Sequence, residues 1–323
     1  MGRFDARLEE LRAQGIYLRL MWVGTFSLAR LLVTSMGDLR RLRRLRPSEE
    51  QYVRPPRRYE LPPYTPGMRV CTSDEKYLRP TRYCNHRATE VVALAHALGA
   101  YQVSDAEFAR AAFEFAKEKL VVEILPLDDV VETLHRGTGT CFQCISVFIA
   151  LCRAAGIKAR YKMFAMNMIQ AWEDGIGVDP LVKKWYDSLG YFMIEGEGEA
   201  LIDGRWVVAH VGPSAERQAA GGIPITRLGE DALGIWFTAR PGTIMRMESI
   251  PPGLGPGSRL LQRIAPGSMQ RVSLSVLKQI ERGRQIIQEA GGVRAYDEKV
   301  RSALGPKTPE VELTARPEIV FVE

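Results

Sequence analysis

The sequence lacks the cysteine pattern of a disulfide-stabilised or metal-binding protein. Its 323 residues include an odd number of irregularly spaced cysteines, namely Cys71, Cys84, Cys141, Cys144 and Cys152. Residues 141 and 144 form one C-x-x-C motif, but no second such motif and no spaced histidine pair follows it, as a zinc finger or ribbon would require. An acidic calcium-binding loop is also absent. The sequence therefore predicts no metal and no cofactor.

The chain also lacks a long uninterrupted apolar run. Residues 16–36 are strongly apolar, but Arg19 and Arg30 interrupt them, and an arginine near the centre of a membrane-spanning helix costs about 2.5–3.5 kcal/mol. No basic start and small-residue cleavage site flank a clean apolar core, as a secretory signal would need. We expect an amphipathic helix that packs on the protein body, forms a homodimer, or makes peripheral contact with a membrane. Unpaired cysteines and the missing signal favour the cytoplasm, with membrane association as an alternative.

Positive charge is concentrated in one region rather than spread along the chain. The formal net charge is +6, and the excess gathers in a block of arginines: Arg40, Arg41, Arg43, Arg44, Arg46, Arg54, Arg57 and Arg58. Such a block can contact phosphate or anionic lipid, although a solvated basic surface is the simpler interpretation. No aromatic residues suited to base stacking are interleaved with it, so we do not expect a nucleic-acid partner.

The composition predicts a globular chain whose segments differ in character. Apolar residues make up 46% of the sequence, enough for a sizeable core. We divide the chain into a basic amphipathic helical region (1–46), a proline-rich extended linker (47–88), a mixed helix and strand core (89–240) and a C-terminal helical extension (241–323). Helices are expected within the extension at 272–290 and 293–304, where apolar residues recur with helical spacing.

A glycine-rich approach to a cysteine is the most informative motif that is present. The residues Gly-Thr-Gly-Thr-Cys at 137–141 precede an apolar run with helical spacing, and Gly156 is placed to end that helix before a strand begins. A threonine in this position can cap the helix. Cys141 is thus predicted at a helix N-terminus, where unpaired N–H groups and the helix dipole favour the reactive thiolate.

This region resembles the core of the transglutaminase-like superfamily. Its papain-like members place a cysteine at a helix start and follow the helix with R-A-x-G-I-x-A-R-Y, which residues 153–161 match. Residues 199–210 resemble the hairpin of the family, written E-x-x-x-x-G-x-W-x-x-x-D. The similarity extends from about residue 105 to 238. It implies an α+β fold with a papain-like core, in which helices with a cysteine at a helix start are followed by an antiparallel sheet.

The same resemblance reveals an exchange at the expected catalytic positions. Glu195 occupies the position of the catalytic histidine of the family, and His210 occupies that of its aspartate. The resemblance implies a rearranged triad of Cys141, His210 and Glu195, with His210 as the base if it reaches the thiol, because a triad is defined by geometry and not by chain order. A carboxylate near the thiol would raise the pKa of Cys141 and oppose thiolate formation.

Three functions remain open from the sequence. The first is cysteine-dependent acyl chemistry on a peptide or small amide substrate through a thioester, giving hydrolysis, transamidation or cyclisation. The second is a catalytically degenerate binding protein that uses the same cleft. The third is a different enzyme that uses the Glu195/His210 strand, with Cys141 as a covalent handle or as a metal ligand.

Candidate substrate contacts come from several segments. Glu197 and Glu199 alternate with Glu195 in a predicted strand, so all three should point to one face, where they need solvent, partners or a cation. An insertion at residues 163–191 should lie over the cleft and contribute Trp172. Gln143 and Trp206 complete the predicted substrate-binding set.

Overall fold

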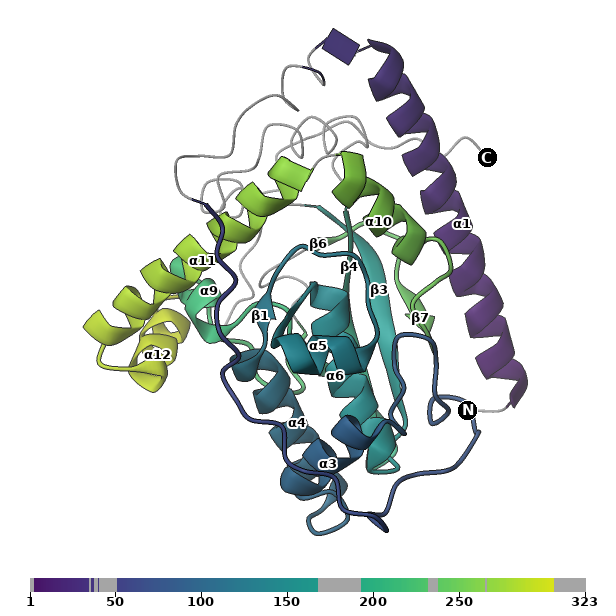
Figure 1. Cartoon of the computed structure of the whole chain (residues 1–323), viewed down its shortest axis with the longest axis vertical. Coiled ribbons are helices and arrows are strands. Elements are labelled where there is room, and N and C mark those ends of the chain that lie inside the picture. The colour runs from purple at the N-terminus through teal and green to yellow at the C-terminus, as the bar shows by residue number, and fades with distance from the viewer. Residues whose placement is uncertain are drawn as a thin grey trace.

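The computed structural model confirms an α+β chain in which helices precede an antiparallel sheet (Figure 1). It describes residues 3–34, 36–37, 40, 51–167, 193–231, 238–264 and 266–304. The helices that precede the sheet are α1 (Arg3–Thr34), α3 (Thr89–Ala97), α4 (Asp105–Lys119), α5 (Val130–Arg136) and α6 (Cys141–Ala154). A short parallel pair, β1 (Val121–Val122) and β2 (Thr138–Gly139), lies among them.

The main sheet is antiparallel throughout, in the order β5-β4-β3-β6, with β7 also paired to β3. Its strands are β3 (Ala159–Asn167), β4 (Met193–Ile202), β5 (Arg205–Ala209), β6 (Thr238–Ala239) and β7 (Met245–Met247). The predicted hairpin is present as β4 and β5, joined by Asp203 and Gly204, which both have positive φ, as a type I′ turn requires. The sheet continues through β7, beyond residue 240, where the sequence placed the end of the core.

Helix α6 is the buried centre of the fold. Thr140 accepts a hydrogen bond from the Gln143 N–H, and the Gln143 side chain accepts one from the Thr140 N–H, which forms a capping box at the predicted helix start. Gly156 follows the helix with φ of 87°, a left-handed conformation that favours glycine. The helix packs closely on β4, because a Cβ on Gly198 would lie 2.7 Å from the Phe148 ring.

The proline-rich segment, described from residue 51 to 88, forms turns, bends and one isolated bridge but neither helix nor strand. The Cys71 N–H donates to the carbonyl of Ala154 at the end of α6 (3.1 Å). Arg54 binds the buried Glu123 carboxylate with two nitrogens, at 2.8 and 3.1 Å. These contacts attach the segment to the helical layer, so it is an ordered part of this face of the protein.

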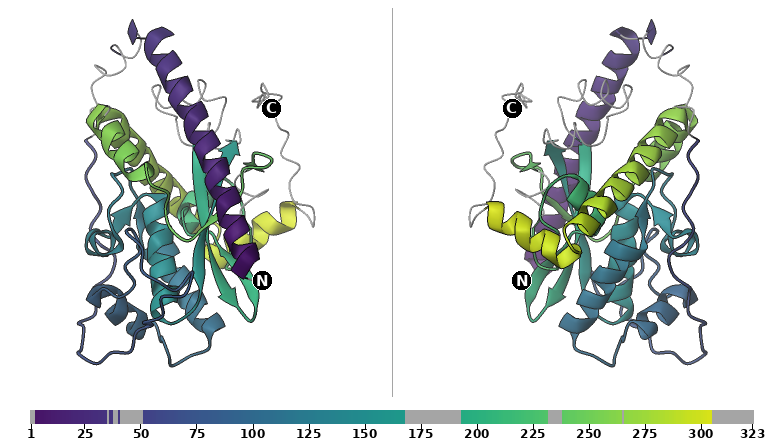
Figure 2. Two further views of the ribbon diagram at one scale, coloured as in Figure 1. Left: turned by 90° about the vertical axis from the view of Figure 1, so that its right-hand side faces the viewer. Right: turned by 90° about the vertical axis from the view of Figure 1, so that its left-hand side faces the viewer.

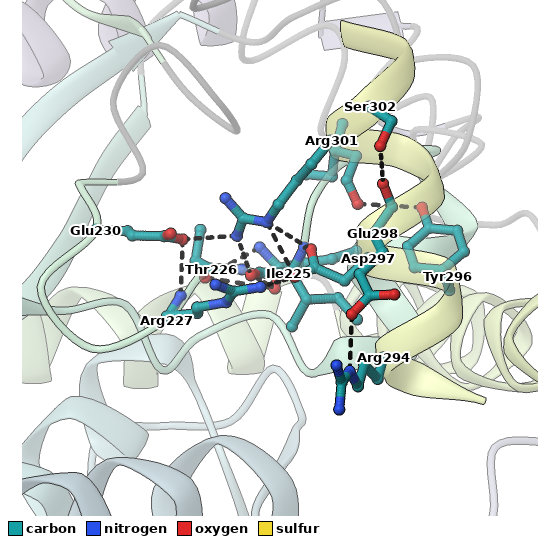
Figure 3. A network of polar contacts seen from close by, with 12 residues as sticks. Ile225, Thr226, Arg227, Glu230, Arg294, Tyr296, Asp297, Glu298, Arg301 and Ser302 are labelled. Atoms are coloured by element: carbon teal, nitrogen blue, oxygen red, sulfur yellow. Dashed lines mark hydrogen bonds and ion pairs between the residues drawn. The ribbon is translucent and has the colours of Figure 1, made fainter. Parts of the chain in front are cut away.

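After the hairpin, the described residues form the helices α9 (Ala215–Ala220), α10 (Leu254–Ile264), α11 (Pro266–Glu289) and α12 (Val293–Leu304). The last two confirm the predicted helices at 272–290 and 293–304. Polar contacts join α12 to the loop after α9 (Figure 3). Asp297 accepts from the Ile225 N–H at 2.9 Å, and Arg301 donates to the Ile225 carbonyl and to Glu230 at 2.8 Å each.

Helix α1 lies along one flank of the molecule (Figures 1 and 2). Its Glu9 carboxylate is 3.1 Å from a nitrogen of Arg160 on β3, and its Tyr17 hydroxyl donates to the carbonyl of Pro252 at 3.0 Å. The predicted amphipathic helix at residues 16–36 is thus part of a longer helix that packs on the body. Within the described ranges, no helix is both long and apolar enough to cross a membrane.

The close approach of α9 to α11 generates a stability prediction. Gly283 in α11 faces the backbone carbonyl of Glu216, and a Cβ at Gly283 would overlap its oxygen. We expect Gly283→Ala to lower the free energy of unfolding by about 1–3 kcal/mol, because two helices would have to separate. The matched control is Gly257→Ala in α10, where nothing lies within 4 Å. There alanine should raise stability by up to about 1 kcal/mol through its helix propensity.

Urea unfolding monitored by circular dichroism measures both changes. Equal effects of the two substitutions would contradict the close packing of α9 on α11.

Candidate active site

The cysteine singled out by the sequence is the first residue of α6, and its side chain is partly exposed. The backbone N–H of Phe142 favours the ionised form of Cys141 and lowers its pKa, as a helix N-terminus allows, although burial has the larger, opposite effect. The chain that follows β5 passes close by, because a Cβ on Gly212 would lie 3.4 Å from the Cβ of Cys141. At the start of α6, Cys141 therefore lies against the turn that contains Gly212.

The carboxyl group of Glu195 lies beside the Cys141 thiol, within hydrogen-bonding reach. Burial raises the pKa of Cys141 well above its ordinary value, and the negative charge of Glu195 raises it further. Burial also raises the pKa of Glu195, although the thiol and the Gly196 N–H, which donates at 3.1 Å, oppose this effect. The resting state that follows is a neutral thiol next to a carboxylate of enhanced basicity.

A buried arginine completes this cluster. Arg217 on α9 is 6% exposed, and electrostatic attraction links its guanidinium to the Glu195 carboxylate and would extend to a thiolate at Cys141. Burial lowers the pKa of Arg217, but the Glu195 carboxylate opposes the shift, and a guanidinium keeps its charge in proteins. Its Nε donates to Gln279 of α11 at 3.2 Å. Sequence reasoning missed Arg217, since one arginine in a six-residue helix carries no motif.

His210 lies against a different carboxylate. Its Nδ1 is 3.4 Å from Glu197, and the Nζ of Lys162 is 2.8 Å from the other oxygen of Glu197. Burial opposes ionisation of Glu197, but His210 and Lys162 outweigh it and lower the pKa of Glu197 to about 2. Burial lowers the pKa of His210. The structure thus pairs Cys141 with Glu195 and His210 with Glu197.

A buried lysine supports the turn behind the thiol. The Nζ of Lys117 donates to the Pro213 carbonyl and the Gln218 side chain at 2.9 Å each, to the Thr226 hydroxyl at 3.0 Å, and to the His210 carbonyl at 3.4 Å. Burial lowers its pKa to about 7. Four oxygen acceptors from the turn, from α9 and from the loop beyond it converge on one ammonium group. Lys117 therefore fixes the segment that carries both Gly212 and Arg217.

The predicted substrate-binding residues have structural partners of their own. Gln143 is buried in the capping box, and Glu199 accepts from Arg160 at 2.6 Å. The ring of Trp206 lies 3.9 Å from the Arg160 guanidinium carbon. Trp172, with most of the expected insertion at 163–191, falls outside the described residues, and residues 163–167 belong to β3. Substrate contact by this set stays a prediction.

The three alternating glutamates of β4 have different partners. Glu197 and Glu199 pair with Lys162 and Arg160 of β3, whereas Glu195 lies beside Cys141. In the part of the chain that the structure describes, no three potential metal ligands come together.

Comparison with known proteins gives one family match. Residues 92–173 match the model of the transglutaminase-like superfamily. A crystal structure from Cytophaga hutchinsonii, of a protein named only as a candidate cysteine protease, is similar at 20% identity and a TM-score of 0.31. The similarity covers 42% of this chain and 40% of that protein. No curated protein is significantly similar to the chain in sequence.

The contact between Glu195 and Cys141 generates a prediction on thiol reactivity. Glu195→Gln removes a negative charge beside the sulfur, so the pKa of Cys141 should fall. Iodoacetamide labelling of Cys141 near neutral pH should then become about tenfold faster. Mass spectrometry over a pH series measures this in a Cys71→Ser background, because Cys71 is also partly exposed. Unchanged or slower labelling would contradict the assigned contact.

The contact between Glu197 and its two partners generates a prediction on pH. The pKa of Glu197 falls from 4.5 to about 2 on folding, so its contribution is present above about pH 4.5 and is lost as the pH falls toward 2. The stability difference between the wild type and Glu197→Gln should therefore shrink by about 3 kcal/mol over this window. Denaturant unfolding at several pH values measures it, with exposed Glu298→Gln as the control. A pH-independent difference would show that Glu197 is not ion-paired.

Proposed function

We propose, from the match of residues 92–173 to the transglutaminase-like superfamily, that the chain performs cysteine-dependent acyl chemistry on an amide or peptide-like substrate. The observation that carries the proposal is the meeting of the Cys141 thiol with the Glu195 carboxyl at the start of α6. This pairing supplies a nucleophile and a proton acceptor in contact with each other. The helix start supplies N–H groups toward which an oxyanion can be directed.

Glu195 is the group we assign as the general base. It accepts the thiol proton while the sulfur of Cys141 attacks the amide carbon, which forms the S–C bond and places the π electrons on oxygen. When the C–N bond breaks, Glu195 returns the proton to the leaving amine and a thioester remains. Water or a second amine then attacks the thioester with Glu195 as base again, and the thiol is released. The raised pKa of Glu195 brings it nearer the range that proton transfer needs.

Arg217 is the group we assign to charge compensation. A buried cation near the sulfur offsets the negative charge that passes from Glu195 to the thiolate and then to the oxyanion. Its hydrogen bond to Gln279 fixes the guanidinium from the side of α11. The active site thus draws on the C-terminal helical region as well as on the segment that matches the family. His210, paired with Glu197, acts in this proposal as a positioning residue.

A second candidate function rests on the raised thiol pKa. Burial and the adjacent Glu195 carboxylate disfavour the thiolate form of Cys141 at rest. This favours a binding protein that retains the fold but does not catalyse acyl transfer. The two candidates differ in whether a thioester forms at Cys141.

The test incubates the full chain with short peptide amides, with hydroxylamine as an added acceptor, and follows amine release together with the intact mass of the protein. We expect an acyl adduct at Cys141 and none in Cys141→Ser. Glu195→Gln should lose about 10²–10⁴-fold in amine release while its thiol becomes easier to alkylate. This opposite response separates a base from a residue that merely maintains the fold. Cys71→Ser, which replaces a second partly exposed cysteine, should behave as the wild type.

Amine release that persists in Cys141→Ser would overturn the proposal. Failure of the wild type to form any adduct, together with tight binding of the same peptides, would establish the binding protein instead.

A further inference from the structure

Helix α1 exposes a continuous apolar stripe. The exposed apolar side chains recur every three, four or seven residues, which places them on one face of a helix: Leu8, Leu11, Leu18, Trp22, Phe26 and Val33. Three of them near the middle are 66–75% exposed, far more than side chains that pack on the body. At 1.5 Å per residue the stripe is about 40 Å long. An exposed apolar surface of this extent marks an interaction site.

The charges of α1 are sorted between its two faces. The acidic side chains that the structure describes on this helix both turn toward the body, where Glu9 pairs with Arg160 and Glu10 pairs with Lys76 at 2.9 Å. The exposed Arg12, Arg19 and Arg30 follow the apolar stripe along one border. Arg40 is also exposed, and four further arginines follow it in the sequence by residue 46. The outer face is therefore apolar with a basic margin.

The inner face of α1 is fixed to the protein. Ala13, Tyr17 and Leu20 are buried at 2–5% exposure in the main core. The Tyr17 hydroxyl binds the Pro252 carbonyl, and the Glu9 pair joins the helix to the sheet. The outer stripe is thus presented on a rigid support along the flank of the molecule (Figures 1 and 2). Contact with a partner does not require α1 to detach.

We propose that the outer face of α1 binds the surface of an anionic lipid bilayer, with the helix lying in the plane of the membrane. The apolar stripe would enter the boundary between headgroups and acyl chains, and the arginine margin would contact lipid phosphates. Trp22 lies in the middle of the stripe, and tryptophan is favoured at this depth. The helix does not meet the requirements for a membrane span, which agrees with an in-plane arrangement.

Charge complementarity favours lipid over a second copy of this chain. Two such faces packed together would bring two arginine margins to one apolar seam, and the described outer side chains of α1 offer them no carboxylate. An anionic membrane supplies both an apolar layer and the missing negative charge. The occupant that matches both properties of the surface is therefore the bilayer.

The experiment measures cosedimentation of the full chain with vesicles of phosphatidylcholine alone and of phosphatidylcholine mixed with phosphatidylglycerol. We expect binding to the anionic vesicles, weakened by salt. Trp22→Ser combined with Phe26→Ser should reduce binding about tenfold or more. Arg12→Gln, Arg19→Gln and Arg30→Gln should each reduce binding to anionic vesicles about fivefold. Val53→Ser is the matched control, because Val53 is 74% exposed outside α1, and it should bind as the wild type.

Each variant replaces exposed side chains, and circular dichroism checks that the fold is retained. Absence of wild-type binding to anionic vesicles, or equal binding of the Trp22/Phe26 double variant, would overturn the proposal. Sedimentation velocity in the same buffer measures the oligomeric state, which tests the alternative of a subunit interface. A wild-type dimer that the double variant converts to a monomer, without vesicle binding, would identify the face as a subunit interface.

Discussion

The alignment of three carboxylates on one strand, two of them buried and the third partly buried, is the constraint on which much of this structure depends. Glu195, Glu197 and Glu199 all belong to β4, and a carboxylate removed from water is costly unless a cation or hydrogen-bond donors compensate it. The compensating groups come from different parts of the chain: Arg217 of α9, Lys162 of β3 with His210, and Arg160 of β3 with Arg246 of β7. These contacts therefore connect α9, β3, β7 and the residue after β5 to the same strand.

This arrangement also decides what the cysteine can do. Helix α6 places Cys141 at its N-terminus, which favours a thiolate, whereas burial and Glu195 favour the protonated thiol. The second effect prevails in the resting protein. A nucleophile activated at the moment of attack by an adjacent carboxylate agrees with this balance better than a permanently ionised one. The buried Arg217 supplies the positive charge that such a site needs once the proton has moved.

Pairing of charges between different elements also determines the character of the two faces of α1. Its described acidic side chains pair with cations of the body, Glu9 with Arg160 of β3 and Glu10 with Lys76, and this leaves basic and apolar side chains to face outward. Because the acidic side chains are used in contacts with the body, the outer face of the helix is basic and apolar. Helix α1 is apolar on both faces: the inner face packs on the core, and the outer face is available to bind a partner.

The sequence by itself determined the local structure around the cysteine. The threonine cap before Cys141 and the helix that Gly156 ends depend on neighbouring residues, and the structure confirms both. The hairpin that the family resemblance implied is also present, as β4 and β5. Only the tertiary structure decided which charges meet. Arg217 lies 76 residues beyond Cys141, and no local pattern shows that α9 brings it to the thiol. The partners of His210 and Glu195 could not be predicted from the sequence either, because pairing between these groups depends on how β4, β5 and α6 pack.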